Sequence, residues 1–282
     1  MKHTTKSPKA YKDLEFLSSP DARTIRILSE FLEPQRRFRR ANIKDTVVFF
    51  GSARIGPRTE MLKGLKKAED AVRKIHRPTK ELIRALRHAE IQVEMSRYYE
   101  DAVELARLLS HWSRHLKNPY RFVICSGGGP GIMEAANKGA ILGGGKSIGM
   151  NISLPFEQFA NEYISPDLDF EFHYFFMRKF WFAYLSKALI VFPGGFGTLD
   201  EFMEILTLRQ TKKSTKDIAI VLYGSEYWNK IIDFRELVNH GMIEQADLDL
   251  FKVIDNPQEA FVHLRDFLAG HYLKNDKQEG SV

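Results

Sequence analysis

Short apolar segments alternate with longer amphipathic ones along most of this chain, and this order constrains the fold more than any other feature. The segments expected to form strands are 46–50, 122–125, 147–152, 188–192, 218–222 and 251–254. The segments expected to form helices are 102–115, 132–142, 175–187, 199–210, 227–238 and 257–268. Nearly uniform apolar runs are typical of parallel strands that are covered on both faces. The sequence therefore predicts an α/β fold with a doubly wound, Rossmann-like parallel sheet.

Composition indicates an ordinary globular protein of 282 residues, 44% hydrophobic and 28% charged. Its apolar runs are far shorter than the roughly 18 to 20 residues that span a bilayer, and the first residues lack the apolar core of a secretory signal. We therefore expect a cytoplasmic protein without a membrane partner. We expect an N-terminal extension over 1–45, one domain over 46–270 and a flexible tail over 271–282. The only cysteine, Cys125, lies in an apolar run and is predicted to be a core residue.

Glycine-rich turns follow three of the predicted strands. They read FGSAR at 50–54, SGGGPGIME at 126–134 and PGGFGTLDE at 193–201. A glycine turn that leads from a strand into a helix exposes backbone N–H groups at the positive end of the helix dipole, which suits phosphate. The carboxyl ends of parallel strands meet at one edge of the sheet, where such folds bind ligands. Together the three turns predict a nucleotide-sized site.

The spacing of these glycines excludes two familiar phosphate motifs. A dinucleotide fingerprint starting at Gly127 or Gly195 would require a third glycine where Ile132 or Asp200 stands. The triplet GKS at 145–147 imitates the end of a P-loop, but it precedes a strand and lacks the earlier glycine. We interpret it as a helix-to-strand turn.

Two charged residues near the last glycine turn are candidates for chemistry. Arg178 and Lys179 point in different directions on a helix, so at most one of them faces a given site. Arg178 precedes the strand that delivers the turn, where its guanidinium could grip a phosphate, a ribose or a carboxylate. Glu201 lies one turn into the following helix, where it either stabilises the helix dipole or places a carboxylate beside the ligand.

Metal or cofactor chemistry is not expected. His111 and His115 have i, i+4 spacing, but HWSRH lacks the glutamate of a zinc-protease helix and has no evident third ligand. Amino-acid decarboxylation would need pyridoxal phosphate on a lysine, and no lysine here has a context that marks it for that role. We expect neither a metal nor a cofactor.

The motifs at 126–140, 177–179 and 193–201 resemble those of the LONELY GUY family, phosphoribohydrolases often labelled lysine decarboxylases. The resemblance covers 46–51 and about 98–267. It implies a Rossmann-like homodimer, or a higher homo-oligomer, that cleaves the N-glycosidic bond of a nucleoside 5′-monophosphate to free base and ribose 5-phosphate. The substrate would be AMP or a cytokinin riboside monophosphate. A binding protein for nucleotides or a molybdenum-cofactor carrier stays open as the alternative, because this fold also binds such ligands without cleaving them.

Carried over by motif, the resemblance implies that Arg178 and Glu201 are catalytic. The residues it implies for substrate binding are Gly51, Ser52, Gly127, Gly128, Gly129, Glu134, Met177, Gly194, Gly195, Gly197 and Thr198. Breaking a ribosyl C–N bond develops positive charge on the sugar, which a carboxylate stabilises while it orients or deprotonates water. The Arg178 and Glu201 pair favours an enzyme over a pure binding protein.

About forty residues before Tyr98 have no counterpart in the family. Segment 54–97 holds twelve Lys or Arg and six Asp or Glu, a surplus of +6. Apolar residues recur at helical spacing on both sides of Pro78, which predicts a basic helical hairpin over about 56–97. It could bind nucleic acid, but a solvated face or an oligomer contact is favoured because aromatics and nucleic-acid motifs are missing. A role as a lid or in substrate choice is a further hypothesis. The aromatic-rich stretch 175–184 predicts core plus dimer interface.

Overall fold

A seven-stranded parallel sheet forms the centre of the molecule. The computed structural model describes residues 9–118, 121–154, 159–214 and 216–273, and the strand order within them is β4-β3-β2-β1-β5-β6-β7. The strands are β1 (Thr46–Phe50), β2 (Val123–Ser126), β3 (Ser147–Ile152), β4 (Asp169–Phe172), β5 (Ser186–Val191), β6 (Ala219–Tyr223) and β7 (Lys252–Ile254). The order reverses between β1 and β5, which makes their carboxyl ends a topological switch point. The predicted doubly wound α/β fold is confirmed.

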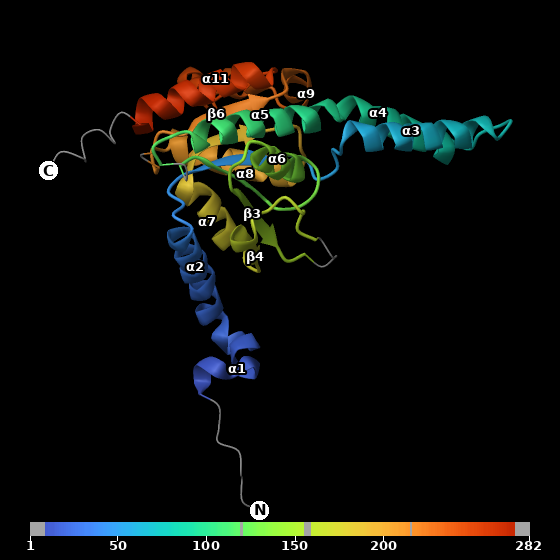
Figure 1. Ribbon diagram of the computed structural model, residues 1–282. Coiled ribbons are helices and arrows are strands. Elements are labelled where there is room, and N and C mark those ends of the chain that lie inside the picture. Colours follow the sequence, from blue (N-terminus) through green and yellow to red (C-terminus); the bar gives the residue numbers. More distant parts are fainter. Residues whose placement is uncertain (1–8, 119–120, 155–158, 215, 274–282) are drawn as a thin grey trace, which may run out of the picture.

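Helices cover both faces of this sheet (Figure 1). They are α1 (Leu14–Ser18), α2 (Arg23–Arg40), α3 (Arg58–Arg73), α4 (Lys80–Met95), α5 (Arg97–Arg114), α6 (Ile132–Leu142), α7 (Phe175–Leu185), α8 (Phe196–Gln210), α9 (Ser225–Ile231), α10 (Phe234–Asn239) and α11 (Pro257–Leu268). One hydrophobic cluster joins the sheet to α5, α6 and α11, and a second joins it to α2, α7 and α8. A π-helical turn, Ala269–Leu273, continues α11 into the start of the predicted tail. Residues 274–282 lie outside the described residues.

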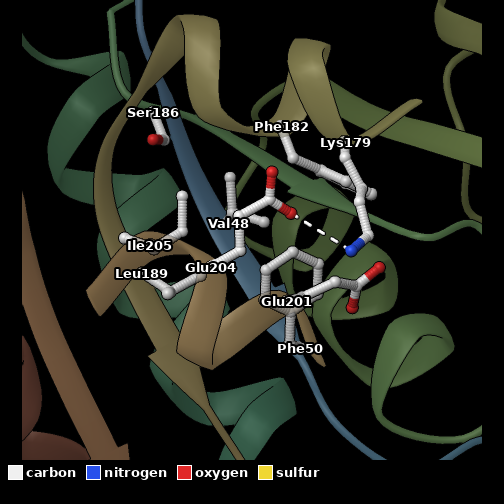
Figure 2. A pocket seen from close by; sticks show the side chains of 9 residues that line it. All are labelled: Val48, Phe50, Lys179, Phe182, Ser186, Leu189, Glu201, Glu204 and Ile205. Atoms are coloured by element: carbon white, nitrogen blue, oxygen red, sulfur yellow. Dashed lines mark ion pairs between the residues drawn. The ribbon is translucent and has the colours of Figure 1, made fainter. Parts of the chain in front are cut away.

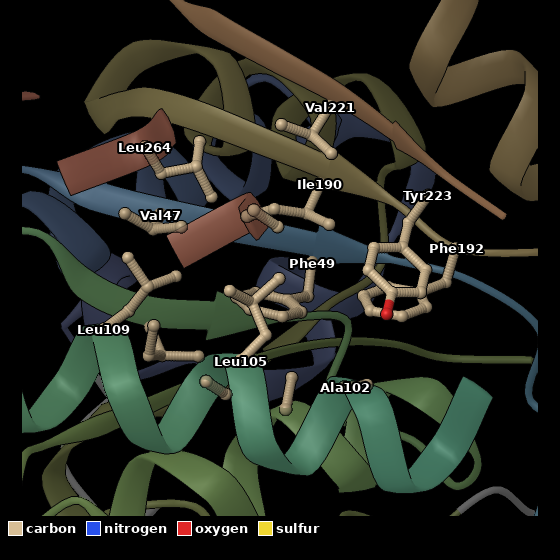
Figure 3. Close-up of a cluster of buried hydrophobic side chains, with 14 of the residues drawn as sticks. Val47, Phe49, Ala102, Leu105, Leu109, Ile190, Phe192, Val221, Tyr223 and Leu264 are labelled. Carbon is tan, nitrogen blue, oxygen red and sulfur yellow. The ribbon is translucent and has the colours of Figure 1, made fainter. Parts of the chain in front are cut away.

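The central strand β1 shows how its sequence builds both clusters. Successive side chains of a strand point to opposite faces, so Val47 and Phe49 enter the first cluster and Val48 and Phe50 the second. Figure 3 shows Val47 and Phe49 above the α5 helix. Every residue of β1 is buried, and each large apolar side chain contributes on the order of 1.5 to 3 kcal/mol by burial. Cys125 of β2 is buried too, as predicted.

The N-terminal helix α2 is attached to α7 through a defect in its own hydrogen bonding. Pro34 lies inside α2 and has no N–H, so the carbonyl four residues earlier, at Glu30, lacks its usual helical donor. The indole N–H of Trp181 in α7 donates to that carbonyl at 3.0 Å. The Glu30 carboxylate accepts from the backbone N–H groups of His173, at 2.8 Å, and Tyr174, at 3.2 Å. Helix α2 thereby fixes both the start and the middle of α7.

The predicted basic hairpin is confirmed as helices α3 and α4, which pack on each other and extend away from the sheet (Figure 1). Thr79 caps α4 by accepting from the N–H of Leu82 at 3.4 Å. Neither helix contains a buried residue. The hairpin is held at its base by Arg58, whose backbone N–H donates to the Glu100 carboxylate of α5 at 3.0 Å.

Three local expectations were wrong. The predicted helix over 227–238 is two helices, because Ile232 is extended and the Asp233 carboxylate caps a new start at α10. The helix expected over 175–187 ends at Leu185, and β5 follows without a loop. Strand β4 was not predicted, although its buried and exposed residues alternate. The domain boundaries at 45 and 270 stay a prediction.

Candidate active site

A cleft lies along the carboxyl edge of the sheet and has a free volume of about 1650 Å³, its open mouth included. The turns after β1, β2, β3 and β5 form its floor, and side chains from α4, α7, α8 and α9 form its walls. Of the predicted site residues, Gly51, Ser52, Gly127, Arg178, Gly194, Gly195, Gly197, Thr198 and Glu201 line it. The structure thus brings all three glycine turns to one place.

The turn between β5 and α8 is shaped to receive an anion. Gly195 is the N-cap of α8 and offers no side chain to the free N–H groups of the first helical turn. A Cβ at Gly195 or Gly197 would meet nothing within 4 Å, so both backbones are open to the cleft. At Gly194 there is no room for a side chain, since an added Cβ would lie 2.2 Å from Thr198 Oγ1. The positive end of α8 therefore faces free space in the cleft.

Ser52 connects the three turns through its backbone. Its N–H donates to the Pro193 carbonyl at 2.9 Å, and its carbonyl accepts from the Ile132 N–H at 3.1 Å. A Cβ at Gly51 would lie 2.7 Å from the Ile132 side chain, so only glycine allows this approach. The turns after β1, β2 and β5 consequently hold one another in register.

Arg178 reaches the cleft from α7 as a buried side chain with two protein partners. Its Nε donates to the Met150 carbonyl at 2.7 Å, and its Nη1 lies 3.3 Å from Glu201 Oε1. A Cβ at Gly127 would lie 2.5 Å from Arg178 Nη2, so the guanidinium occupies the place of that missing side chain. The arginine is therefore fixed against the glycine turn after β2.

Lys179 points away from Arg178, as predicted for neighbours on a helix. Its Nζ forms an ion pair with Asp200 at 2.6 Å. A second ion pair, with Glu204 at 3.2 Å, is drawn in Figure 2. These partners lie on α8, on either side of Glu201 in sequence. Lys179 is thus part of the contact between α7 and α8, whereas Arg178 faces the cleft.

The Glu201 side chain is only 14% exposed, and its surroundings raise its pKa from 4.5 to about 7. Burial is the main cause, opposed by the charges of Arg178 and Lys179. Behind the carboxylate, a small cavity is walled largely by apolar side chains, among them Val48, Phe50 and Phe182 (Figure 2). A carboxyl group held in such a place takes up and releases a proton near neutral pH.

Four predicted substrate-binding residues do not line the cleft. The carbonyls of Gly128 and Gly129 accept from the Asn161 amide at 2.9 and 3.0 Å. The Glu134 carboxylate accepts from Tyr99 OH at 2.6 Å, beyond the cleft wall. Met177 is buried in the second hydrophobic cluster. Their assignment to the ligand stays a prediction, and in this chain they shape the turn and the core around the site.

The sequence reasoning missed several residues that do line the cleft. Among them are Arg54, His88, Gln92, Met95, Asn151 and Tyr227. Tyr227 OH donates to the Gly194 carbonyl at 2.8 Å and so supports the turn between β5 and α8. His88, Gln92 and Met95 come from the inserted hairpin, whose path over the cleft no local pattern encodes. Asn151 stands at the end of β3, where strand position alone was a usable signal.

The described ranges contain neither a metal-binding cluster nor a membrane-spanning helix. Within them, no three His, Cys, Asp or Glu side chains come close enough to hold a metal ion. His111 and His115 instead face each other, with ring centroids 4.6 Å apart. None of the described helices combines the length and apolar character needed to cross a membrane.

Fold and cleft define a Rossmann-like α/β protein with an open glycine turn and a largely buried Arg–Glu pair at its topological switch point. Residues 133–264 match the family described as "Possible lysine decarboxylase". Curated relatives of this chain carry phosphoribohydrolase and nucleosidase names. These matches confirm the family resemblance predicted from the motifs.

Two of these curated relatives illustrate the extent of the similarity. The probable cytokinin riboside 5′-monophosphate phosphoribohydrolase LOG4 of Oryza sativa subsp. japonica is 28% identical, over 36% of this chain and 45% of its own length. The pyrimidine/purine nucleotide 5′-monophosphate nucleosidase of Escherichia coli K12 is 30% identical, over 48% of this chain and 32% of its own length. The matches therefore span less than half the length of either relative.

Among solved structures, a molybdenum cofactor binding protein from Rippkaea orientalis is 18% identical to this chain. The superposition covers 61% of this chain and 88% of that one, with a TM-score of 0.42.

Proposed function

We propose that this protein is a phosphoribohydrolase that cleaves the N-glycosidic bond of a nucleoside 5′-monophosphate and releases the free base and ribose 5-phosphate. One observation carries the proposal: the largely buried Glu201 carboxylate has a pKa of about 7 and lies 3.3 Å from Arg178, beside the open N-terminus of α8. A protein that only bound a nucleotide has less need of such a carboxylate.

In the proposed reaction, the 5′-phosphate binds at the N-terminus of α8, where Gly195 and Gly197 leave room for its oxygens. The phosphate then positions the sugar, so that binding energy remote from the reacting bond is used for orientation. Arg178 holds Glu201 in place, and its remaining N–H groups can reach the ligand, because the arginine fork carries five donors.

Glu201 has two roles in this scheme. Its negative charge stabilises the oxocarbenium character that develops on the ribose as the C–N bond lengthens. It also takes a proton from the attacking water, which a carboxylate with a pKa of about 7 does better than an ordinary one. The proton balance closes when the departing base is protonated and ribose 5-phosphate carries the hydroxyl.

The test is to incubate the purified protein with AMP and other nucleoside monophosphates and to follow free base and ribose 5-phosphate by chromatography. Glu201→Gln keeps the shape of the side chain and removes the base, so we expect release by the parent protein and none by the variant. Glu204→Gln is a matched control on the same helix that changes the Lys179 ion pair instead. Nucleotide binding without release would instead favour a carrier or binding protein.

The preferred base and the oligomeric state are part of the proposal. We place AMP and a prenylated adenine nucleotide among the substrates to be compared by kcat/KM. We also propose a homodimer formed through α7, because Phe176 and Tyr184 are 50% and 47% exposed on a helix whose other face is core. Phe176→Ser should shift the sedimentation coefficient toward that of the monomer.

A further inference from the structure

The cleft continues on both sides of the anion-binding turn. In the strand order, β2 and β3 lie to one side of β1 and β5, and β6 lies to the other. Gly127, Arg178 and Asn151 mark the β2 and β3 side, whereas Tyr227, which follows β6, marks the opposite side. If the 5′-phosphate binds at α8, the sugar and base extend toward Arg178. The space beside Tyr227 then lies beyond the phosphate.

The inserted helix α4 reaches the same cleft through His88, Gln92 and Met95. Arg97, the first residue of the following helix α5, forms an ion pair of 2.6 Å with Glu226, the neighbour of Tyr227 on α9. Tyr227 in turn holds the Gly194 carbonyl at 2.8 Å. The end of the hairpin is therefore tied to the element that supports the phosphate-binding turn, and its side chains His88 and Gln92 line the same cleft.

The polar side chains at this end are suited to an anion. Arg54, His88 and Gln92 all present N–H groups, and none of the three side chains forms an ion pair within the part of the chain that the structure describes. Glu201 is the only carboxylate among the described cleft-lining residues, and it is paired with Arg178 on the other side. Within the cleft lining, a second phosphate would meet one fixed positive charge and up to three side-chain donors, and Glu60 lies with His88 and Gln92 in the neighbouring hollow between α3 and α4.

We propose that Arg54, His88 and Gln92 form an anion subsite that takes a phosphoryl group attached to the 5′-phosphate. The ligands of the cleft then include nucleoside 5′-diphosphates, either as substrates or as competitors of the monophosphate. The inference rests on the proposed function for the position of the 5′-phosphate. It also gives the insertion a role at the site, since His88 and Gln92 belong to the hairpin.

Titration calorimetry with AMP and ADP tests the subsite, in magnesium-free buffer at fixed ionic strength and in the Glu201→Gln background to prevent turnover. We expect ADP to bind about tenfold more tightly than AMP, the order contributed by one charge-assisted hydrogen bond. Arg54→Ala with His88→Ala should abolish this difference and leave the AMP dissociation constant within about twofold. Both side chains are exposed, so their truncation spares the core. Arg84→Ala, an exposed residue of α4 outside the cleft lining, is the control and should keep the difference.

Equal or weaker binding of ADP than of AMP in the Glu201→Gln protein would overturn the subsite. An equal loss of AMP and ADP affinity in the double variant would overturn it too, because Arg54 and His88 would then act on the first phosphate. The hydrolysis assay distinguishes failure of the subsite from failure of the proposed function. If the parent protein hydrolyses AMP but the Glu201→Gln protein shows no preference for ADP, only the subsite is refuted. If ADP is preferred through Arg54 and His88 but no nucleotide is hydrolysed, only the phosphoribohydrolase function is refuted.

Discussion

Replacing Glu201 by Gln should make the protein more stable while it abolishes the proposed activity. The fold raises the pKa of Glu201 from 4.5 to about 7, so the folded state favours the neutral carboxyl. A group whose pKa is raised by folding stabilises the protein fully at pH values below its pKa in the unfolded chain. That stabilisation is lost as the pH rises through its pKa in the folded protein. The pH window is therefore about 4.5 to 7, and above it the charged Glu201 lowers the free energy of unfolding.

The magnitude follows from the size of the shift. A change of about 2.5 pKa units corresponds to about 3 kcal/mol, because each unit is worth 1.36 kcal/mol. Glutamine imitates the neutral carboxyl, so Glu201→Gln should raise the free energy of unfolding by about 3 kcal/mol near pH 8 and by about zero near pH 4.5. Arg178 keeps its charge in both proteins and retains an oxygen partner in the variant.

Urea unfolding of both proteins at a series of pH values measures this difference directly. Glu204→Gln is the control, and its effect should stay below about 1 kcal/mol, since it removes a partly exposed ion pair with Lys179 and only the smallest of the charge effects on Glu201. A stability gain that does not grow with pH, or a loss of stability at high pH, would refute the reasoning. The same pKa predicts that kcat/KM of the parent protein falls about tenfold per pH unit below 7.

Four further substitutions test the geometry. Arg178→Lys should lower kcat/KM by about 100-fold, because a lysine cannot hold both Glu201 and the Met150 carbonyl. Steady-state kinetics measures this change, and a loss of less than about threefold would contradict it. Gly197→Ala should fold at least as stably as the parent yet weaken ribose 5-phosphate binding, whereas Gly194→Ala should lose about 1 to 3 kcal/mol of stability through its clash with Thr198. Thermal unfolding and calorimetry separate these two, and equal behaviour would contradict the assigned geometry. Trp181→Phe should cost about 1 to 3 kcal/mol in urea unfolding, because the Glu30 carbonyl loses its donor, and an unchanged midpoint would argue against that bond.

The sheet and the glycine turn between β5 and α8 could be predicted from sequence because both depend on local patterns. Apolar runs such as 188–192 reveal buried strands, and PGGFGTLDE marks a strand-to-helix turn without reference to the rest of the chain. Strand β4 escaped because four alternating residues give a weak signal, and the break at Asp233 escaped because an N-cap inside an amphipathic run looks like an ordinary helix surface.

The site was predictable on the side of the motifs and not on the side of the insertion. Arg178 and Glu201 meet because their helices flank the same strand end, which sequence order implies. His88 and Gln92 reach the cleft only because the hairpin returns beside α9 and is tied there through Arg97 and Glu226. That contact joins residues far apart in the chain and depends on the path of the hairpin, which its own periodicity does not encode.

The missing N–H of Pro34 has a consequence for how this protein can be shortened or recombined. The carbonyl it leaves free holds the indole of Trp181, one turn from Arg178 on the same helix. A fragment starting at β1 would retain every catalytic motif and lose the lateral support of the helix that carries the arginine. Chimeras with relatives should therefore exchange residues 23–40 together with 173–185, as one cassette, to keep the guanidinium aligned.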